Sequence, residues 1–203
     1  MNPSLSSDGH RRSKSGPTVA QTWRVTFRRR NDARPPLDSA ALERLALAYA
    51  GRYATSRAKL AEYLKRKIVE RGWDGQDAPP IAAIVARFAE LGYVDDRTLA
   101  EARGRALAAR GYGARRLGQA LGALGISDAD AESARLQARE DAWRTALRFA
   151  ERRRFGPYAR EAADEATRRR AFGAMIRAGH APEHVRRILD ARPGDVPDVD
   201  SEG

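Results

Sequence analysis

One helical pattern occurs three times along this chain, and this repetition constrains its fold more than any other feature. The copies are residues 56–68 (SRAKLAEYLKRKI), 113–126 (GARRLGQALGALGI) and 166–180 (ATRRRAFGAMIRAGH). In each copy a basic residue precedes an apolar position, and a second apolar residue follows four positions later, which places both apolar side chains on one helix face. The aligned pairs are Leu60 and Leu64, Leu117 and Leu121, and Ala171 and Met175.

The distance between copies predicts how the chain is organised. Leu60 and Leu117 are 57 residues apart, and Leu117 and Ala171 are 54 apart, so each repeat unit is three helices long. Repeats of this length are typical of stacked modules that share a core with their neighbours. We therefore predict an all-α chain of three tandem three-helix, helix-turn-helix-like repeats in an elongated array. This architecture favours a binding protein over a catalyst. The predicted boundaries are residues 1–37 for a disordered basic arm, 38–92, 93–138 and 139–191 for the repeats, and 192–203 for a disordered acidic tail.

Short polar residues mark the expected helix ends. Asp95 and Asp96 are suited to cap the first helix of repeat two, because acidic side chains accept hydrogen bonds from free N–H groups there. Ser127 and Asp130 resemble a capping box with Asp in place of Glu. Trp73 lies in a loop between glycines, and its role stays open.

The charge balance points to an acidic or phosphate-bearing partner. The 203 residues include 38 Lys or Arg and 27 Asp or Glu, which gives a formal charge of +11. Residues 1–37 carry +6 and residues 192–203 carry −3, so the helical body keeps +8 and is itself basic. Arginine outnumbers lysine 34 to 4. That ratio is equally compatible with a coding bias and with selection for forked phosphate contacts.

Composition also indicates a compartment. The chain contains no cysteine, which excludes disulfides and thiolate metal sites and suits a reducing environment. No uncharged stretch approaches the roughly 18 apolar residues of a membrane span. Residues 1–20 lack the apolar segment of a signal peptide and have the Ser-, Gly- and Pro-rich composition of a disordered arm. We expect a soluble, cytoplasmic protein with no membrane association.

The sequence contains no recognisable catalytic motif. No phosphate-binding loop occurs, and the glycines at 111, 113 and 118 miss the dinucleotide-binding spacing. His180 and His184 are four residues apart, which suits a metal on a helix face. Pro182 is expected to start the helix between them, which leaves His180 in the preceding loop. We expect no catalytic residue, no metal and no cofactor.

Basic residues recur at the same place in each repeat and form the candidate binding surface. Arg115 and Arg116 begin a helix after a glycine turn, where free backbone N–H groups also favour anions. Three such clusters would form a periodic cationic surface that suits a periodic polyanion or filament. The alternative for any single cluster is an ordinary solvated helix face. The candidate filament- or DNA-binding residues are Arg57, Lys59, Arg66, Lys67, Arg115, Arg116, Arg168, Arg169 and Arg170.

Over roughly residues 40–189 the sequence resembles the RecX family, the bacterial regulators of the RecA recombinase. The resemblance is strongest in residues 56–60 (SRAKL), in residues 91–96 (LGYVDD) after Phe88, and in residues 111–117 (GYGARRL). The motif residues are Gly92, Tyr93, Asp95, Asp96, Gly113, Leu117, Leu121 and Gly125. The resemblance implies an all-α tandem-repeat protein without enzymatic activity. The longer connection at residues 69–80, the weakly matched third repeat and the N-terminal arm depart from the family pattern.

The resemblance also implies partners and a role. It implies binding in the helical groove of RecA–DNA filaments, with inhibition of filament growth, strand exchange, ATP hydrolysis and LexA-cleavage coactivation, and hence a role in DNA repair, recombination and the SOS response. The expected partners are the RecA filament and single- or double-stranded DNA, and the expected state is a monomer. Two alternatives stay open. Trihelical units with a basic helix also read major grooves, as in helix-turn-helix transcriptional regulators, and a helical adaptor would recognise only protein.

Overall fold

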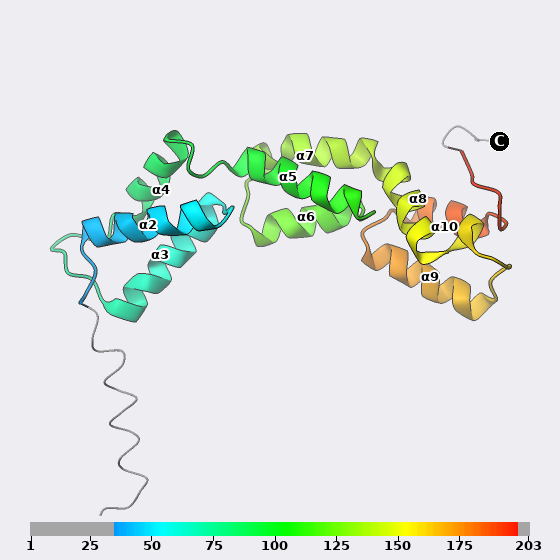
Figure 1. Cartoon of the computed structure of the whole chain (residues 1–203), viewed down its shortest axis with the longest axis horizontal. Helices are drawn as coiled ribbons and strands as arrows, with labels where there is room; N and C mark the ends of the chain where they lie inside the picture. The colour runs from blue at the N-terminus through cyan, green and yellow to red at the C-terminus, as the bar shows by residue number, and fades with distance from the viewer. Residues whose placement is uncertain (1–34, 199–203) are drawn as a thin grey trace, which may run out of the picture. The chain divides into compact units, whose positions relative to one another are not determined.

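The computed structural model describes residues 35–198, in which all regular structure is helical (Figure 1). The prediction of an all-α fold is confirmed for this part of the chain, whereas residues 1–34 of the expected arm lie outside it. The α-helices are α2 Ser39–Arg52, α3 Arg57–Arg71, α4 Ile81–Glu90, α5 Asp96–Ala109, α6 Ala114–Ala123, α7 Asp128–Glu140, α8 Ala142–Arg153, α9 Glu165–Arg177 and α10 Pro182–Asp190, with a 3-10 turn η1 at Gly156–Tyr158. None of these helices is long and apolar enough to cross a membrane.

Each successive trio of helices encloses its own cluster of buried side chains. The first cluster lies among α2, α3 and α4, the second among α5, α6 and α7, and the third among α8, α9 and α10. The expectation that neighbouring repeats share one core is therefore wrong. The half-buried ring of Tyr112 packs against both the second and the third cluster. The three trios are otherwise joined through backbone and side-chain contacts at their junctions.

The repeated helical pattern corresponds to the second helix of each trio. Leu64 in α3, Leu121 in α6 and Met175 in α9 are completely buried. The residues four positions earlier in each helix, Leu60, Leu117 and Ala171, are buried as well. These pairs lie on one helix face because residues i and i+4 are stacked one turn apart. The apolar alignment read from the sequence is confirmed as three core-facing stripes.

The junction between the second and third trios is a direct backbone contact. The N–H of Gly113 donates to the carbonyl of Ala178 at 3.0 Å, and the N–H of Arg115 donates to that of Gly179 at 3.3 Å. A Cβ atom on Gly113 would lie 2.3 Å from the Gly179 carbonyl oxygen. Gly179 itself has a φ of +95°, a conformation that strongly favours glycine. The start of α6 can therefore reach the end of α9 only with glycine at both positions.

The junction between the first and second trios is formed at the equivalent positions of those two repeats. Ser56, the N-cap of α3, donates its hydroxyl to the carbonyl of Leu124 at the end of α6. A Cβ atom on Gly125 would lie 2.6 Å from the Cβ of Ala58. In both junctions the start of the second helix in one repeat contacts the glycine turn that ends the second helix of the next. This shared contact explains why Gly125 and Gly179 occupy equivalent places.

At the beginning of the described chain, Leu37 belongs to the fold rather than to the arm. It is completely buried in the first core, its N–H donates to the carbonyl of Gly72 at 3.0 Å, and its carbonyl accepts from Asp74 N–H at 2.9 Å. The boundary expected after residue 37 therefore falls too late. Trp73 packs against the same core, and its indole N–H donates to the carbonyl of Asp77 at 2.7 Å, so this tryptophan has a structural role.

The described part of the C-terminal tail also contacts the fold. The N–H of Gly194 donates to the carbonyl of Pro157 in η1 at 2.8 Å, and the Arg187 side chain donates to the carbonyl of Asp198. Residues 192–198 of the predicted acidic tail therefore contact the fold, because the tail backbone satisfies a carbonyl group that η1 presents. Residues 199–203 lie outside the described part of the chain.

Candidate nucleic-acid interface

Asp95 and Asp96 are adjacent in the sequence but stabilise different helices. Asp95 is the N-cap of α5 and accepts the N–H of Thr98 at 2.9 Å. This hydrogen bond and a second one from the Thr98 hydroxyl hold the pKa of Asp95 below its usual value. Asp96 is buried and accepts the N–H of Arg57, the first residue of α3, at 2.9 Å. The prediction that both acids cap the same helix is wrong for Asp96, because it points across the repeat junction.

Arg57 was expected in the binding surface, but its side chain holds the first two repeats together. Its Nε atom lies 3.3 Å from the Asp96 carboxylate, and its guanidinium also pairs with Asp130 of α7. Asp130 in turn belongs to the predicted capping box, since its N–H donates to the hydroxyl of Ser127 at 3.2 Å. Two carboxylates offset the positive charge of Arg57. Its main role is therefore to join the first two repeats rather than to bind a polyanion.

Most of the other predicted cations form ion pairs within their own repeat. The pairs are Lys59 with Glu62, Arg66 with Glu70, Lys67 with Glu70, Arg168 with Asp190, and Arg169 with Glu165. Exposed pairs of this kind contribute little to stability. Each carboxylate nevertheless offsets the attraction that its cation would exert on a polyanion. The recurring basic clusters are therefore less cationic than their residue types suggest.

Arg115, Arg116 and Arg170 form no ion pair with any residue in the described range 35–198. The guanidinium of Arg115 donates to the carbonyl of Ile176, which adds a side-chain contact to the junction between repeats two and three. Arg116 is exposed, and its Cζ atom lies 6.0 Å from the centre of the Tyr112 ring. Arg170 is exposed on the first turns of α9.

The turn that contains Tyr112 is contacted by four arginines, namely the C-cap of α5, one residue of α6 and two residues of α8. We name them the Tyr112 arginine cluster: Arg110, Arg116, Arg148 and Arg152. The Cζ atom of Arg110 lies 5.3 Å from the centre of the Tyr112 ring. From α8, Arg148 donates to the carbonyl of Ala108 at 3.2 Å and Arg152 donates to that of Arg110 at 2.9 Å. These carbonyls lie at the C-terminal end of α5, where the helix dipole attracts cations.

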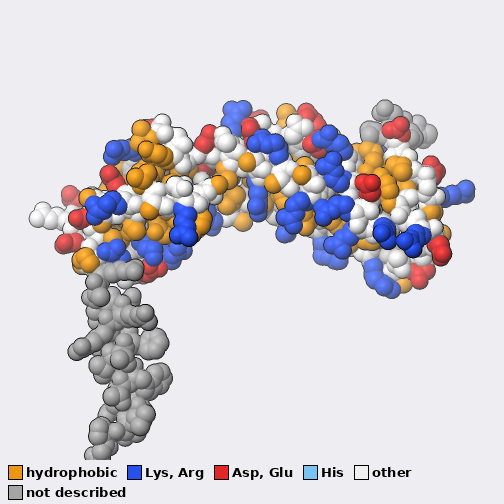
Figure 2. All heavy atoms as spheres, in the orientation of Figure 1, with side chains coloured by type: hydrophobic (Ala, Val, Ile, Leu, Met, Phe, Trp, Pro, Cys, Tyr) orange, Lys and Arg blue, Asp and Glu red, His pale blue; other side chains and the backbone are white. Residues whose placement is uncertain are grey.

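The Tyr112 arginine cluster is not offset by neighbouring acids. Among residues 35–198, none of its four members forms an ion pair with a carboxylate. Figure 2 shows Lys and Arg side chains gathered over α5 and α6 toward α8. Guanidinium groups present forked donors that match phosphate oxygens. This cluster is therefore the strongest candidate site for a phosphate-bearing partner.

Sequence reasoning identified Arg116 but missed the other members of the cluster. Arg148 and Arg152 are four residues apart on α8, a spacing typical of any solvated helix face. Only the packing of α8 against the turn after α5 brings them to the carbonyls of Ala108 and Arg110. Arg110 ends α5 two residues before Tyr112, and the sequence contained a weak signal for it, because the pattern Arg-Gly-Tyr-Gly places a cation and an aromatic ring in one turn.

Beneath this turn, His180 is buried and neutral. Its Nε2 atom lies 3.0 Å from the carbonyl oxygen of Gly111, which can only accept, so Nε2 carries the proton. Burial lowers the pKa of His180 to about 4. The hydrogen bond to Gly111 acts in the opposite direction and raises the pKa, whereas the nearby His184 lowers it further. Helix α10 begins at Pro182, as predicted, and His180 precedes it. Within the described residues, no group of three or more potential metal ligands occurs.

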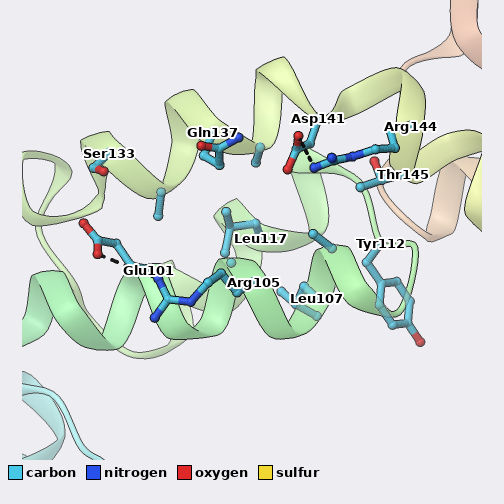
Figure 3. Close-up of a pocket in the computed structure, with 14 residues that line it drawn as sticks. Glu101, Arg105, Leu107, Tyr112, Leu117, Ser133, Gln137, Asp141, Arg144 and Thr145 are labelled. Atoms are coloured by element: carbon cyan, nitrogen blue, oxygen red, sulfur yellow. Dashed lines mark hydrogen bonds and ion pairs between the residues drawn. The ribbon is translucent and has the colours of Figure 1, made fainter.

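A groove of about 400 Å³ lies between α5, α7 and the start of α8 (Figure 3). Its floor includes Leu107 and Leu117. Its charged lining residues are paired with one another, Arg105 with Glu101 and Arg144 with Asp141. The lining contains no histidine, and the chain has no cysteine.

The fold and this surface define the class of the protein: a tandem three-helix repeat protein with an arginine-rich turn at a repeat junction. The chain belongs to the RecX family. It is 34% identical over 132 residues to Regulatory protein RecX of Stenotrophomonas maltophilia (strain R551-3), a match that covers 65% of this chain and 77% of the relative. It is 27% identical over 163 residues to Regulatory protein RecX of Myxococcus xanthus (strain DK1622), covering 75% of this chain and 86% of the relative.

Two crystal structures share the fold. RecX from Lactobacillus salivarius superposes with a TM-score of 0.54 at 18% identity, covering 74% of this chain and 93% of that one. A second structure of regulatory protein RecX gives a TM-score of 0.51 at 18% identity, covering 83% and 85%. No family model matches the chain. The relatives therefore establish a family of regulatory proteins, and the solved structures establish its fold.

Proposed function

We propose that this chain is a non-enzymatic cytoplasmic regulator that binds RecA–DNA filaments and modulates the recombinase and coprotease activities of RecA. Membership of the RecX family supports the regulatory role. The Tyr112 arginine cluster is the observation that supports the binding surface, because four guanidinium groups lie at one repeat junction with no carboxylate partner among the described residues. The proposal assigns this surface to contacts with the polyanionic filament.

Electrostatics favours this surface over the predicted clusters of repeats one and three. A cation that already pairs with a carboxylate gains less free energy from binding a phosphate, because the phosphate must compete with that carboxylate. Within residues 35–198 the guanidinium groups of Arg110 and Arg116 lie over the Tyr112 ring and form no hydrogen bond or ion pair, which leaves their N–H donors available. We therefore propose Arg110 and Arg116 as principal contacts, with Arg115 and Arg170 next. Arg57, Lys59, Arg66, Lys67, Arg168 and Arg169 would then contribute less.

The direct test compares two double variants that remove the same charge. The first, Arg110→Gln with Arg116→Gln, neutralises two unpaired members of the cluster. The control, Arg97→Gln with Arg135→Gln, neutralises one exposed and one half-buried arginine, which pair with Glu101 and Asp128. We expect the first variant to bind preformed RecA–ssDNA filaments more weakly than the control. Each lost phosphate contact should also reduce the magnitude of the negative slope of log K against log salt by about 0.7–0.9.

Other outcomes would separate this proposal from its alternatives. Tighter binding to naked duplex DNA than to RecA–DNA filaments would favour a helix-turn-helix DNA-binding regulator. Filament binding that depends neither on salt nor on the cluster would favour a helical adaptor that recognises only protein. Equal affinities of the two double variants for the filament would remove the Tyr112 arginine cluster from the binding surface.

A further inference from the structure

The first repeat carries three neighbouring tyrosines, of which Tyr49 and Tyr63 pack against the first core and Tyr53 does not belong to it. Tyr49 in α2 stacks on Tyr63 in α3, with ring centres 4.1 Å apart and planes inclined by 13°. The third tyrosine, Tyr53, is the C-cap of α2, and its ring centre lies 5.3 Å from that of Tyr49. The side chains of Tyr49 and Tyr63 are half-buried, whereas Tyr53 is 50% exposed. We call these three residues the tyrosine ladder.

Cations flank the tyrosine ladder at both ends. The Cζ atom of Arg52 lies 5.5 Å from the centre of the Tyr53 ring. At the other end, Arg66 Cζ and Lys67 Nζ lie 5.5 Å and 5.7 Å from the centre of the Tyr63 ring. Arg66 and Lys67 share one acid, Glu70, so this end keeps a net positive charge. Arg52 forms no ion pair with another described residue, and Figure 2 shows cationic and hydrophobic side chains interleaved over α2 and α3.

We propose that the tyrosine ladder is a binding site for a single-stranded nucleic acid, in which Tyr53 stacks on an unpaired base and the flanking cations contact the phosphates. Exposed aromatic rings beside cations are the arrangement that binds single strands without sequence preference, because every base has a π-face. A duplex has its bases stacked internally and offers no base to Tyr53. The ladder therefore favours single strands over duplexes.

A protein partner suits the ladder less well. Arginine and tyrosine are both enriched at protein interfaces, but charged side chains as a group are depleted at the interface core, and lysine is depleted throughout. Here Arg52, Arg66 and Lys67 place three positive charges within 6 Å of the rings. The site requires no RecA, so it goes beyond the proposed regulatory function and is tested without it.

The experiment measures binding of the full chain to a labelled oligothymidylate and to an abasic oligomer of the same length and charge. The test variant is Tyr53→Ala, which leaves the hydrogen bond between its own N–H and the Tyr49 carbonyl in place. Tyr53→Phe keeps the ring and serves as the rescue. The matched control is Tyr93→Ala, because Tyr93 is 53% exposed and packs on Phe88 with no described cation over its ring. An oligouridylate of equal length distinguishes RNA from DNA.

Stacking on one base predicts that Tyr53→Ala weakens oligothymidylate binding by about 5- to 150-fold. Tyr53→Phe and Tyr93→Ala should bind like the parent, and abasic binding and the salt slope should not change. The proposal is overturned if Tyr53→Ala binds oligothymidylate like the parent or loses affinity equally for the abasic oligomer. It is also overturned if Tyr53→Ala affects only RecA binding, which would identify a protein contact. None of these outcomes bears on the Tyr112 arginine cluster.

Discussion

Replacing Asp96 by alanine should destabilise the protein more than replacing its neighbour Asp95. Asp96 is 5% exposed, and its carboxylate accepts the N–H of Arg57 at 2.9 Å across the junction of repeats one and two. That N–H belongs to the first turn of α3 and has no partner within its own helix. Asp95 is exposed and caps only its own helix, α5.

The structure sets the expected magnitudes. Loss of a buried acceptor costs about 1–3 kcal/mol, and loss of a negative charge at a helix N-terminus adds about 0.3–1 kcal/mol. The side chain of Arg57 is 44% exposed, so its ion pair with Asp96 contributes only about 0–1 kcal/mol. The free energy of unfolding should therefore fall by about 2–4 kcal/mol in Asp96→Ala. Asp95→Ala should cost about 1 kcal/mol, the usual value for an N-cap.

The assay is urea unfolding of both variants, followed by far-UV circular dichroism and by tryptophan fluorescence. Tandem repeats can unfold in steps, so the two signals must coincide before one free energy is assigned. Asp96→Asn keeps an acceptor for the Arg57 N–H and should recover part of the loss. The reasoning is refuted if Asp96→Ala and Asp95→Ala differ by less than about 0.5 kcal/mol, the usual error of such comparisons.

Three further predictions concern the remaining junctions and the ends of the fold. Gly113→Ala should lower the free energy of unfolding by about 2–4 kcal/mol, because its Cβ would lie 2.3 Å from the Gly179 carbonyl. Gly118→Ala, with open space around its Cβ, should stabilise the same helix by about 0.5–1 kcal/mol, and equal denaturation midpoints for the two variants would contradict the junction. Because the folded pKa of His180 is about 4, below its value of 6.5 when unfolded, the stability it contributes is complete above pH 6.5 and is lost as the pH falls toward 4. Thermal melts should therefore show a smaller drop in Tm between about pH 6.5 and 5 for His180→Gln than for the parent, and parallel pH profiles would argue against a buried neutral ring. Removal of residues 1–34 should leave Tm unchanged, whereas removal through Leu37 should cost about 1.5–3 kcal/mol, and equal melting of both truncations would contradict the burial of Leu37.

The features predicted correctly from the sequence depend on local periodicity. The apolar pairs that begin at Leu60, Leu117 and Ala171 follow from helix geometry, because a core-facing stripe must recur at i and i+4. The capping role of Ser127 and the helix start at Pro182 are likewise set by neighbouring residues. The chosen repeat boundaries at residues 92/93 and 138/139 stay predictions, as does the monomeric state.

The features that were missed depend on contacts between distant segments. Asp95 and Asp96 are chemically identical, and only the packing of α3 against the second repeat makes one of them a cross-repeat cap. Leu37 follows two prolines and resembles the end of a linker, yet it pairs with residues 72–74. Local pattern contains no information about such partners.

The candidate site likewise combines features set by local sequence with features set by contacts between distant segments. The recurrence of cations at the start of the second helix was visible in the sequence, as were the acids three or four positions away that pair with most of them. Ion pairs between distant residues were not visible. Arg168, for example, pairs with Asp190, which is 22 positions away. Arg148 and Arg152 became candidates only through hydrogen bonds to the end of α5. The surface with the greatest unpaired positive charge was therefore not the one that the repeat alone predicted.

The most direct test of the proposed function is a titration of the full chain against DNA-dependent ATP hydrolysis by RecA, with and without excess single-stranded DNA. A regulator that binds the filament affects many RecA subunits at once. We predict inhibition well below one copy per RecA subunit, persistence of that inhibition in excess DNA, and weaker inhibition by Arg110→Gln with Arg116→Gln than by the control pair. Inhibition that requires coating of the DNA and disappears when excess strand is added would contradict the proposal and identify a DNA-binding competitor.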